Sequence, residues 1–305
     1  MQKKTAGAAG LLCVLAAAAL WGMMGLYVRR FTAAGLSALD TTALRITCGL
    51  IFVTVYLALC KRDRFRVRLR DLWIFFGTGV CSLLFFSWCY FASINRTSLS
   101  VAGVLLYTSP VFVMLLSALL WKEKITTQKV LSLLLAVTGC AFVSGIVSGH
   151  ARVDGLGLLL GLGSGFGYAL YSIFSRFAID RKYDFWTILF YTFLFCSVCC
   201  LPFADWQTIR PVMAGRWDLI VWMLAMGFFT AFLAYGLYTI GLERMESSRA
   251  AIVASLEPAV GTIVGFLFFH EIPTWDSILG IVLVFSAISI LSIVPPKRKQ
   301  SVNNR

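Results

Sequence analysis

Long apolar segments constrain this chain more than any other feature of its sequence. Polar residues gather in short clusters, and between the clusters lie apolar runs of about 20 residues, the length that crosses a bilayer core as a helix. Ten such segments follow one another: 8–28, 38–60, 72–94, 98–121, 127–147, 155–177, 184–204, 217–241, 247–269 and 275–294. We therefore predict an all-α integral membrane protein with ten transmembrane helices.

The composition agrees with a membrane protein. Of the 305 residues, 59% are hydrophobic and only 13% are charged, whereas soluble domains carry about 25% charged residues. A soluble protein this apolar could not cover its surface with polar groups. The connections between the runs are short, so we expect no inserted soluble domain. The start of the chain is interpreted as the first span and not as a cleaved signal peptide, because its apolar run is too long and lacks a clear polar cleavage zone.

The positions of Lys and Arg predict the orientation. If the N-terminus is cytoplasmic, 20 of the 27 Lys and Arg residues fall on the inside and six on the outside, while Arg45 lies within a span. Because this bias sets the orientation of membrane proteins, we predict that both termini face the cytoplasm from the cell membrane. The net charge of +13 then reflects topology, and we expect no nucleic-acid partner. The basic segment 61–70 is interpreted as a solvated loop at the lipid headgroups.

Two parts of the chain resemble each other at a fixed offset. Residues 90–126 align with residues 238–274 without a gap, at an offset of 148, and eight of the 37 positions are identical. Shared apolar composition would not easily place a Tyr, an Arg, a mid-span Pro and a closing Glu at one offset. The identical pairs are Tyr90/Tyr238, Arg96/Arg244, Ser100/Ser248, Ala102/Ala250, Pro110/Pro258, Leu119/Leu267, Glu123/Glu271 and Thr126/Thr274.

This internal similarity predicts two copies of a five-helix unit, residues 1–150 and residues 151–305, the second ending in a basic cytoplasmic tail. Because five is odd, the second copy enters the membrane upside down. Inverted repeats are an architecture of secondary transporters, in which the binding site lies near the midplane between the halves and is exposed to each side in turn.

Several short motifs accompany the repeat. They are "LW" followed by Gly in the first span, "LRIT" in the second, "LLYTSPVFVMLLSALLWKE" in the fourth and "LEPAVGTIVGFLFFHE" in the ninth. With the ten spans, they resemble the drug/metabolite transporter superfamily, EamA type, over nearly the whole chain. Members of this family move amino acids, nucleobase-related metabolites, sugars and other small organic solutes. The resemblance implies a secondary transporter for a small organic metabolite, and we expect export of an amino acid-like solute by alternating access. Tyr168 departs from the Trp found in many members.

Glu257 lies near the middle of the ninth span and directly precedes Pro258. An ionisable residue at such a depth costs at least about 2.5–3.5 kcal/mol, so it should face a wet cavity or a partner, or be protonated. Pro258 removes a backbone donor and loosens the turn, which frees the carbonyl of Ala254. This combination predicts a ligand or proton site. The alternative is a structural role, in which Glu257 caps freed backbone donors or holds a neighbouring helix. Pro258 and its repeat equivalent Pro110 are predicted hinges.

Arg45 is the other charge within a span, eight residues from the start of the second segment. It could pair with a substrate carboxylate or with Glu257, or it could snorkel to the headgroups. A zwitterionic solute would place its ammonium on Glu257 and its carboxylate on Arg45. Tyrosines, which offer a flat face and a hydroxyl, suit such a solute, although most could be ordinary packing residues. The predicted aromatic contacts are Trp21, Tyr90, Tyr107, Tyr168 and Tyr238, with Tyr171, Tyr191 and Tyr235 as further candidates.

No residue pattern predicts a cofactor, a metal or a catalytic centre. The segment "CSVCC" has CxxC spacing but lacks a second pair and a nearby His, and no Walker-type segment is present. A membrane-embedded enzyme would need a catalytic cluster, and a channel would need a continuous polar stripe. We therefore predict a carrier whose partners are a small-molecule substrate and membrane lipid, with an enzyme or a channel as the alternative. Proton coupling and a homodimer are left open.

Overall fold

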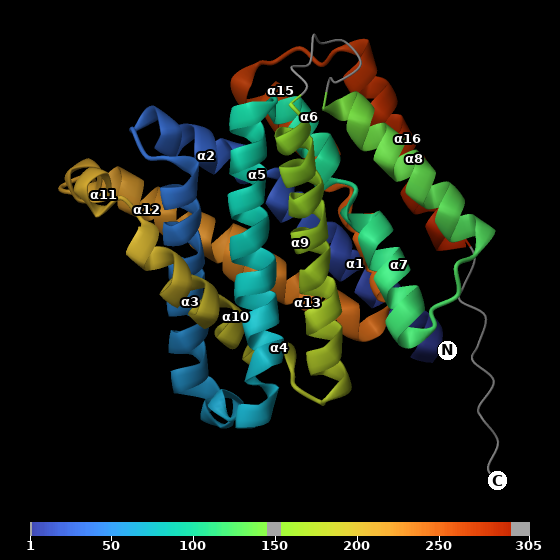
Figure 1. Ribbon diagram of the computed structural model, residues 1–305, viewed down its shortest axis with the longest axis horizontal. Coiled ribbons are helices and arrows are strands. Elements are labelled where there is room, and N and C mark those ends of the chain that lie inside the picture. Colours follow the sequence, from blue (N-terminus) through green and yellow to red (C-terminus); the bar gives the residue numbers. More distant parts are fainter. Residues whose placement is uncertain (1, 145–153, 294–305) are drawn as a thin grey trace.

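The computed structural model describes residues 2–144 and 154–293, and this part of the chain consists of helices and their connections, without a strand (Figure 1). The predicted repeat boundary at 150/151 and the basic tail lie outside the described residues. Nine helices within the described part are long and apolar enough to cross a membrane. The described part of the fifth segment, α8 (Thr127–Val143), has 17 residues and is apolar but shorter. The predicted all-α membrane fold is confirmed.

The first five spans are built from whole helices and from shorter helical pieces. The pieces are α1 (Gln2–Gly22) and α2 (Met24–Ala33) in span 1, α3 (Ala38–Cys60) in span 2, α4 (Leu72–Phe76), η3 (Gly77–Leu84) and α5 (Phe85–Arg96) in span 3, α6 (Leu99–Leu106) and α7 (Ser109–Trp121) in span 4, and α8 in span 5. Two 3₁₀ turns, η1 (Arg62–Phe65) and η2 (Leu69–Asp71), lie between spans 2 and 3.

The last five spans repeat this plan, except that span 6 is one continuous helix whereas span 1 is divided into two. They are α9 (Gly155–Asp180) in span 6, α10 (Phe185–Cys200) in span 7, α12 (Trp217–Met226), η5 (Gly227–Leu233) and α13 (Ala234–Arg244) in span 8, α14 (Ser247–Ala254) and α15 (Glu257–Phe269) in span 9, and α16 (Trp275–Ile293) in span 10. A 3₁₀ turn, η4 (Leu201–Phe203), and the short helix α11 (Trp206–Met213) connect spans 7 and 8.

The two repeats share their irregularities as well as their helices. Spans 4 and 9 are both interrupted, and Pro110 and Pro258 each lie in the first turn of the half-helix that follows the break. A proline is tolerated there because the N–H of that position has no partner within the helix. Spans 3 and 8 are not broken, but each contains a π-helical segment, η3 or η5. Such segments are rare and occur frequently at functional sites.

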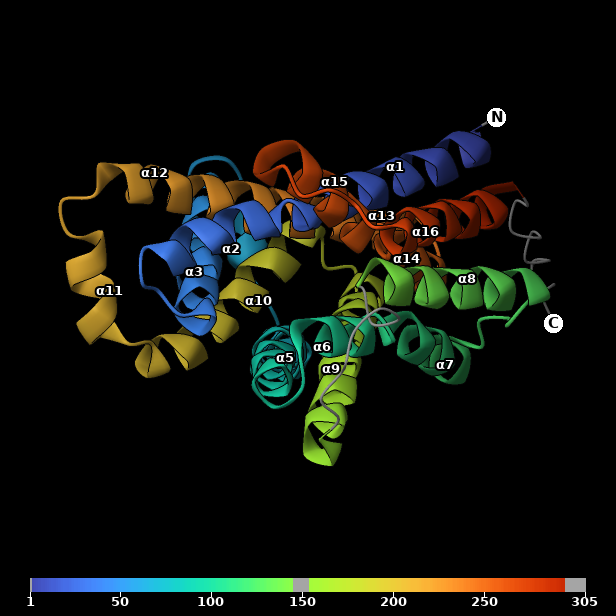
Figure 2. The same cartoon turned by 90° about the horizontal axis from the view of Figure 1, so that it is seen from above.

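Spans 5 and 10 form a close pair at one edge of the bundle, where α8 and α16 lie side by side (Figures 1 and 2). Their backbones touch at two glycines, because a Cβ added to Gly280 would lie 2.6 Å from the carbonyl oxygen of Gly139. Small residues at such crossings let membrane helices approach closely. The remaining spans surround the centre of the molecule, with α9 packed against α5, α6 and α7, and α1 packed against α13.

The glutamates that close spans 4 and 9 occupy different environments, although the repeat makes them equivalent. The Glu123 carboxylate accepts hydrogen bonds from the Ser247 amide (3.3 Å) and the Ser248 hydroxyl (2.5 Å), at the start of α14. Glu271 instead pairs with Arg29 at 2.5 Å, and its side chain is 52% exposed, against 11% for Glu123. Glu123, just after the C-terminus of α7, therefore connects α7 to the N-terminus of α14 at one face of the bundle.

We name that face the basic face; it also carries the loop 61–71 and the turn 181–184. We expect it to be cytoplasmic, because Lys and Arg accumulate on the inside of membrane proteins. A single cysteine introduced at Arg70, which is exposed on the basic face, should be inaccessible to an impermeant thiol reagent in intact cells. A cysteine at Gln207, exposed in α11 on the opposite face, is the matched control and should be labelled. Both variants require a background without the native cysteines, and the reverse labelling pattern would refute the orientation.

Candidate functional site

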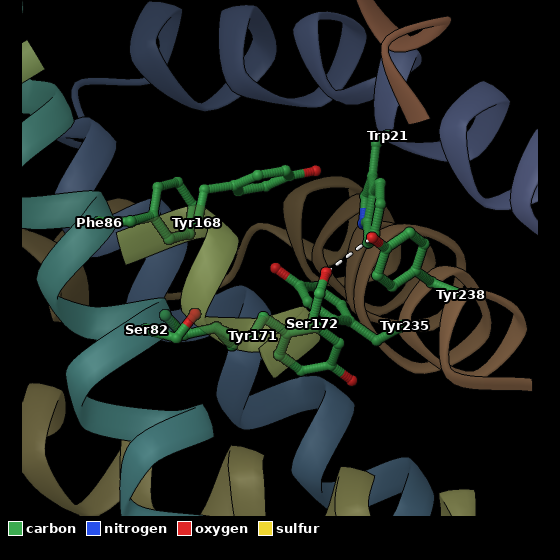
Figure 3. A pocket seen from close by; sticks show the side chains of 9 residues that line it. Trp21, Ser82, Phe86, Tyr168, Tyr171, Ser172, Tyr235 and Tyr238 are labelled. Carbon is green, nitrogen blue, oxygen red and sulfur yellow. Dashed lines mark hydrogen bonds between the residues drawn. The ribbon is translucent and has the colours of Figure 1, made fainter. Parts of the chain in front are cut away.

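A narrow cavity lies at the centre of the bundle, and its volume of about 10 Å³ leaves room for about one water molecule in this conformation (Figure 3). Four spans supply its wall, and they are two equivalent pairs: spans 1 and 6, and spans 3 and 8. The cavity therefore lies where the two repeats meet, as predicted for a site between inverted halves. Its lining residues are Trp21, Ser82, Leu83, Phe86, Tyr168, Tyr171, Ser172, Tyr235 and Tyr238.

Trp21 stands at the centre of this aromatic wall. Its ring centroid lies 5.0 Å from that of Tyr235, 5.3 Å from that of Tyr238 and 6.2 Å from that of Tyr168. Its indole Nε1 donates a hydrogen bond of 3.2 Å to the carbonyl oxygen of Thr230, within the π-helical segment η5. The ring contacts and the satisfied N–H favour one orientation of the indole.

The break after Trp21 is held by direct backbone contact. A Cβ on Gly22 would lie 2.7 Å from the carbonyl oxygen of Glu257 and 2.6 Å from the Cβ of Val260. Only a glycine allows this approach without displacement. The end of α1 is thus fixed against the start of α15, and Trp21 and Glu257 are brought to the same depth of the molecule.

The tyrosine hydroxyls of the wall are anchored to neighbouring helices. The Tyr171 and Thr239 hydroxyls lie 2.8 Å apart, as do those of Ser172 and Tyr238. Buried hydroxyls need such partners, and the rings of Tyr168, Tyr235 and Tyr238 pack beside Trp21 (Figure 3). The aromatic rings suit a flat or cationic group, and the cavity must widen from its present volume of about 10 Å³ before such a group can enter.

Glu257 is the first residue of α15, where the helix dipole favours a negative charge. Its carboxylate accepts a hydrogen bond of 3.3 Å from the Tyr168 hydroxyl, and Tyr107 lies close enough to interact with the same carboxylate. Tyr90 lies close enough to interact electrostatically with the same carboxylate. No Lys, Arg or His among the described residues forms an ion pair with Glu257, so its polar surroundings are tyrosine hydroxyls and a helix terminus.

Arg45 is buried at 4% exposure, so the snorkelling alternative is wrong. Its Nη1 lies 3.5 Å from the Thr230 carbonyl oxygen and 3.7 Å from the Met24 sulfur, and its Nε has no hydrogen-bond partner. Within the described residues no carboxylate pairs with it, although it acts electrostatically on Glu257. A buried guanidinium without an anion is costly, so Arg45 has unused capacity for a negatively charged group.

The predicted site residues divide into three groups. Trp21, Tyr168 and Tyr238 line the cavity. Glu257, Tyr90 and Tyr107 do not line the cavity; Glu257 contacts it through the Tyr168 hydroxyl, and the two tyrosines lie near Glu257. Arg45 does not line the cavity either, and it contacts the Thr230 carbonyl oxygen. The further candidates Tyr171 and Tyr235 line the cavity. Tyr191 does not line the cavity, because its hydroxyl donates to the Phe65 carbonyl oxygen at the basic face.

Several cavity residues escaped the sequence analysis. Ser82, Leu83, Phe86 and Ser172 carry no charge, and their types are common in apolar spans. Helical spacing offered a partial signal, because Phe86 precedes Tyr90 by four residues and Ser172 follows Tyr168 by four, which places each pair on one helix face. Among the described residues, no group of three or more His, Cys, Asp or Glu side chains could hold a metal ion.

The described residues form nine membrane-length helices and one shorter apolar helix in two repeats around a central cavity, the architecture of a multi-pass membrane transporter. The chain belongs to the EamA-like transporter family, whose sequence profile matches it twice, over residues 8–145 and 155–293. The two matches correspond to the two sets of five spans.

Individual proteins resemble the chain over most of its length. An uncharacterized transporter of Archaeoglobus fulgidus is 28% identical over 283 residues, which cover 92% of this chain and 95% of the relative. The threonine/homoserine exporter RhtA of Salmonella typhimurium is 25% identical over 255 residues, covering 81% of this chain and 79% of the exporter. A solved crystal structure with 18% identity superposes with a TM-score of 0.76 over 93% of this chain and 96% of the other, which shows a shared fold.

Pro110 and Pro258 start the half-helices beside the cavity, so we predict that they act as hinges. Pro110→Ala or Pro258→Ala would allow a continuous helix through the break and should slow solute transport in proteoliposomes several-fold. Equilibrium binding of the same solute, followed by tryptophan fluorescence, should change less. Pro211→Ala, in the peripheral helix α11, is the control and should transport at the wild-type rate. If both hinge variants also do so, the prolines are not hinges.

Proposed function

We propose that the protein is a secondary transporter that exports an amino acid-like, zwitterionic solute by alternating access. The observation that carries this proposal is the pair of opposite, unpaired charges that flank the aromatic cavity. Arg45 contacts the Thr230 carbonyl oxygen, to which the cavity residue Trp21 also donates, and Glu257 accepts a hydrogen bond from the cavity residue Tyr168. Neither charge is neutralised by an ion pair among the described residues, so each can serve a group of the solute.

The chemistry of the two charges matches the two ends of a zwitterion. A carboxylate on Arg45 would form charge-assisted hydrogen bonds with a guanidinium that lacks an anion. An ammonium near Glu257 would be attracted both by the carboxylate and by the faces of Trp21 and the tyrosines. Solutes that carry only one of these charges would leave the other buried and uncompensated, which disfavours them.

The resemblance to the threonine/homoserine exporter RhtA supports the same class of solute and the same direction. The name describes the activity of that relative. The proposal for this chain is based on the two charged residues near the cavity, and the resemblance agrees with it. The alternatives, a membrane-embedded enzyme or a channel, draw no support from a particular residue cluster or polar stripe among the described residues.

Labelled neutral amino acids in counterflow assays test the proposed solute. We expect saturable uptake by proteoliposomes, stimulated by amino acid on the opposite side. Glu257→Gln keeps the size and removes the charge, and Arg45→Gln removes the guanidinium; each should lower uptake at least about tenfold, since a charged hydrogen bond contributes about 1.5–3 kcal/mol. Asp63→Asn and Arg210→Gln, both exposed, are the controls and should leave uptake unchanged.

The pH profile separates a coupling role of Glu257 from a structural one. If its protonation is coupled to transport, wild-type uptake should vary between about pH 5.5 and about pH 8, a range that a shifted glutamate can reach, and Glu257→Gln should lose that variation. An unchanged rate and pH profile in Glu257→Gln would make Glu257 structural. Uptake of amino acid amides as fast as the free acids would contradict the role of Arg45.

Alternating access is supported by the different partners of Glu123 and Glu271, the glutamates that close spans 4 and 9. Glu123 joins α7 to the start of α14, and Lys129 bridges Glu123 (3.5 Å) and Glu246 (2.8 Å) beside it. The repeat makes Glu271 and Ser100 the equivalents of Glu123 and Ser248, but Glu271 pairs with Arg29 instead. Because inverted repeats exchange roles between the two access states, we infer that the structure is closed at the basic face and that the opposite state forms a Glu271–Ser100 contact.

Breaking each contact should shift the two access states in opposite directions. Ser248→Ala removes the hydroxyl that donates to Glu123 and should favour the state that opens at the basic face. A cysteine at Ser82, in the cavity wall, is the reporter. An impermeant reagent applied to the face opposite the basic face should then label this cysteine less. Ser100→Ala, its repeat equivalent, should increase that labelling or leave it unchanged. We expect about a fivefold shift for Ser248→Ala, because a hydrogen bond contributes about 1 kcal/mol. Equal effects of both variants would contradict the exchange of contacts.

A further inference from the structure

A second pocket opens on the basic face. It shares no lining residue with the central cavity, and its lining is cationic where that of the cavity is aromatic. It has a volume of about 280 Å³ and lies between the loop 61–71 and the turn that joins α9 to α10. Two segments separated by more than 100 residues form it, and four of its six residues are cations. Its lining residues are Arg66, Val67, Arg68, Arg181, Lys182 and Tyr183.

The acids around this pocket are already paired. Asp71 lies 3.2 Å from the Nε of Arg181, and Asp63 and Asp184 lie 3.0 Å and 3.1 Å from Arg64. Within the described residues, Arg66, Arg68 and Lys182 form no ion pair. The pocket therefore keeps an excess of positive charge, which favours an anionic ligand.

The two sides of the pocket are held in place by a chain of hydrogen bonds. The Tyr183 hydroxyl donates to the buried Asp71 carboxylate at 2.8 Å and accepts from the Arg68 amide at 3.1 Å. Burial raises the pKa of Tyr183, so the hydroxyl stays protonated and keeps donating. Thr187 donates to the Arg64 carbonyl oxygen at 2.9 Å and ties the loop to α10. Arg66, Arg68 and Lys182 therefore converge on a preformed site.

The surroundings of the pocket favour a lipid over a dissolved solute. Leu69, within the pocket loop, is 83% exposed, and Trp73, just after the loop, is 47% exposed. The Arg181 guanidinium lies 5.3 Å from the Trp73 ring centroid. Exposed Trp and apolar side chains next to a basic cluster mark the level at which a bilayer's headgroups meet its acyl chains. A ligand with a phosphate head and apolar tails would satisfy both sides of this boundary.

We propose that this pocket binds the phosphate headgroup of an anionic phospholipid, with Arg66, Arg68 and Lys182 as its ligands. Arginine suits this role because its planar guanidinium donates two parallel hydrogen bonds to a phosphate. The site is distinct from the central cavity, and it does not depend on which solute the protein carries.

Native mass spectrometry of the purified full-length protein tests the site with defined lipids. The protein is equilibrated with equal amounts of phosphatidylglycerol and phosphatidylcholine, and we expect selective retention of phosphatidylglycerol. The double variant Arg66→Gln/Arg68→Gln should retain at least about tenfold less, since each surface cation contributes about fivefold to binding an anionic lipid. The double variant Arg62→Gln/Arg70→Gln removes the same charge from exposed positions of the same loop outside the pocket and should retain about the wild-type amount.

The single variant Lys182→Gln gives an independent measurement if the double pocket variant fails to fold. Equal losses in the pocket and control variants would overturn the site, because a diffuse basic surface would then account for retention. Undiminished retention in both pocket variants would overturn it as well. Glycerol phosphate and inorganic phosphate are the soluble probes, and displacement of the lipid by either at comparable concentration would show a site for a free phosphate and refute the lipid assignment.

Discussion

The low polarity of the membrane interior governs every irregular feature of this protein. A helix that breaks in lipid exposes backbone groups that no water can satisfy, and a charge at that depth needs compensation. This chain breaks spans 1, 4 and 9 and places Arg45 and Glu257 within spans, and all of these features converge at the interface of the two repeats. Glu257 illustrates the solution: it occupies a helix start and accepts a hydrogen bond from Tyr168. The irregularities therefore concentrate at the one place where protein surrounds them.

The repeat organises this convergence without making the halves identical. Equivalent spans line the cavity and equivalent spans carry π-helical segments, yet the first half supplies Arg45 and the second half supplies Glu257. The closing glutamates have the same local geometry, since Lys122 and His270 precede them with φ of 54° and 55°. Their partners nevertheless differ, Ser248 for Glu123 and Arg29 for Glu271. A common fold with unequal contacts is what a carrier with two access states requires, because one conformation can satisfy only one of two equivalent contacts.

The charges at the two faces have different energetic weight. Arg29–Glu271 and Arg30–Asp218 are about half-exposed, and such pairs contribute about 0–1 kcal/mol. Lys129 and Glu123 are nearly buried, with side chains 6% and 11% exposed, so breaking their contact leaves uncompensated charge behind. The buried contacts at the basic face therefore contribute more than the exposed pairs at the opposite face, while the outer rim of the basic face keeps Arg66, Arg68 and Lys182 free of ion pairs among the described residues.

The sequence by itself determined the number of spans, the repeat and the breaks before Pro110 and Pro258. These features depend on local properties, namely apolar length, identities at one offset and a residue that lacks an N–H. The π-helical segments of spans 3 and 8 had no comparable signal, because their residues also suit ordinary helices.

Only the tertiary structure decided which side chains meet. Arg45 could have reached the headgroups from its position in span 2, and it is buried because other spans cover it. Tyr191 and Tyr235 are alike as residues in apolar spans, yet one binds the loop at the basic face and the other lines the cavity. The second pocket, on the basic face, joins a loop and a turn more than 100 residues apart. Side-chain type sets what a group can bind, whereas depth, helix rotation and the identity of the neighbour depend on how the spans pack.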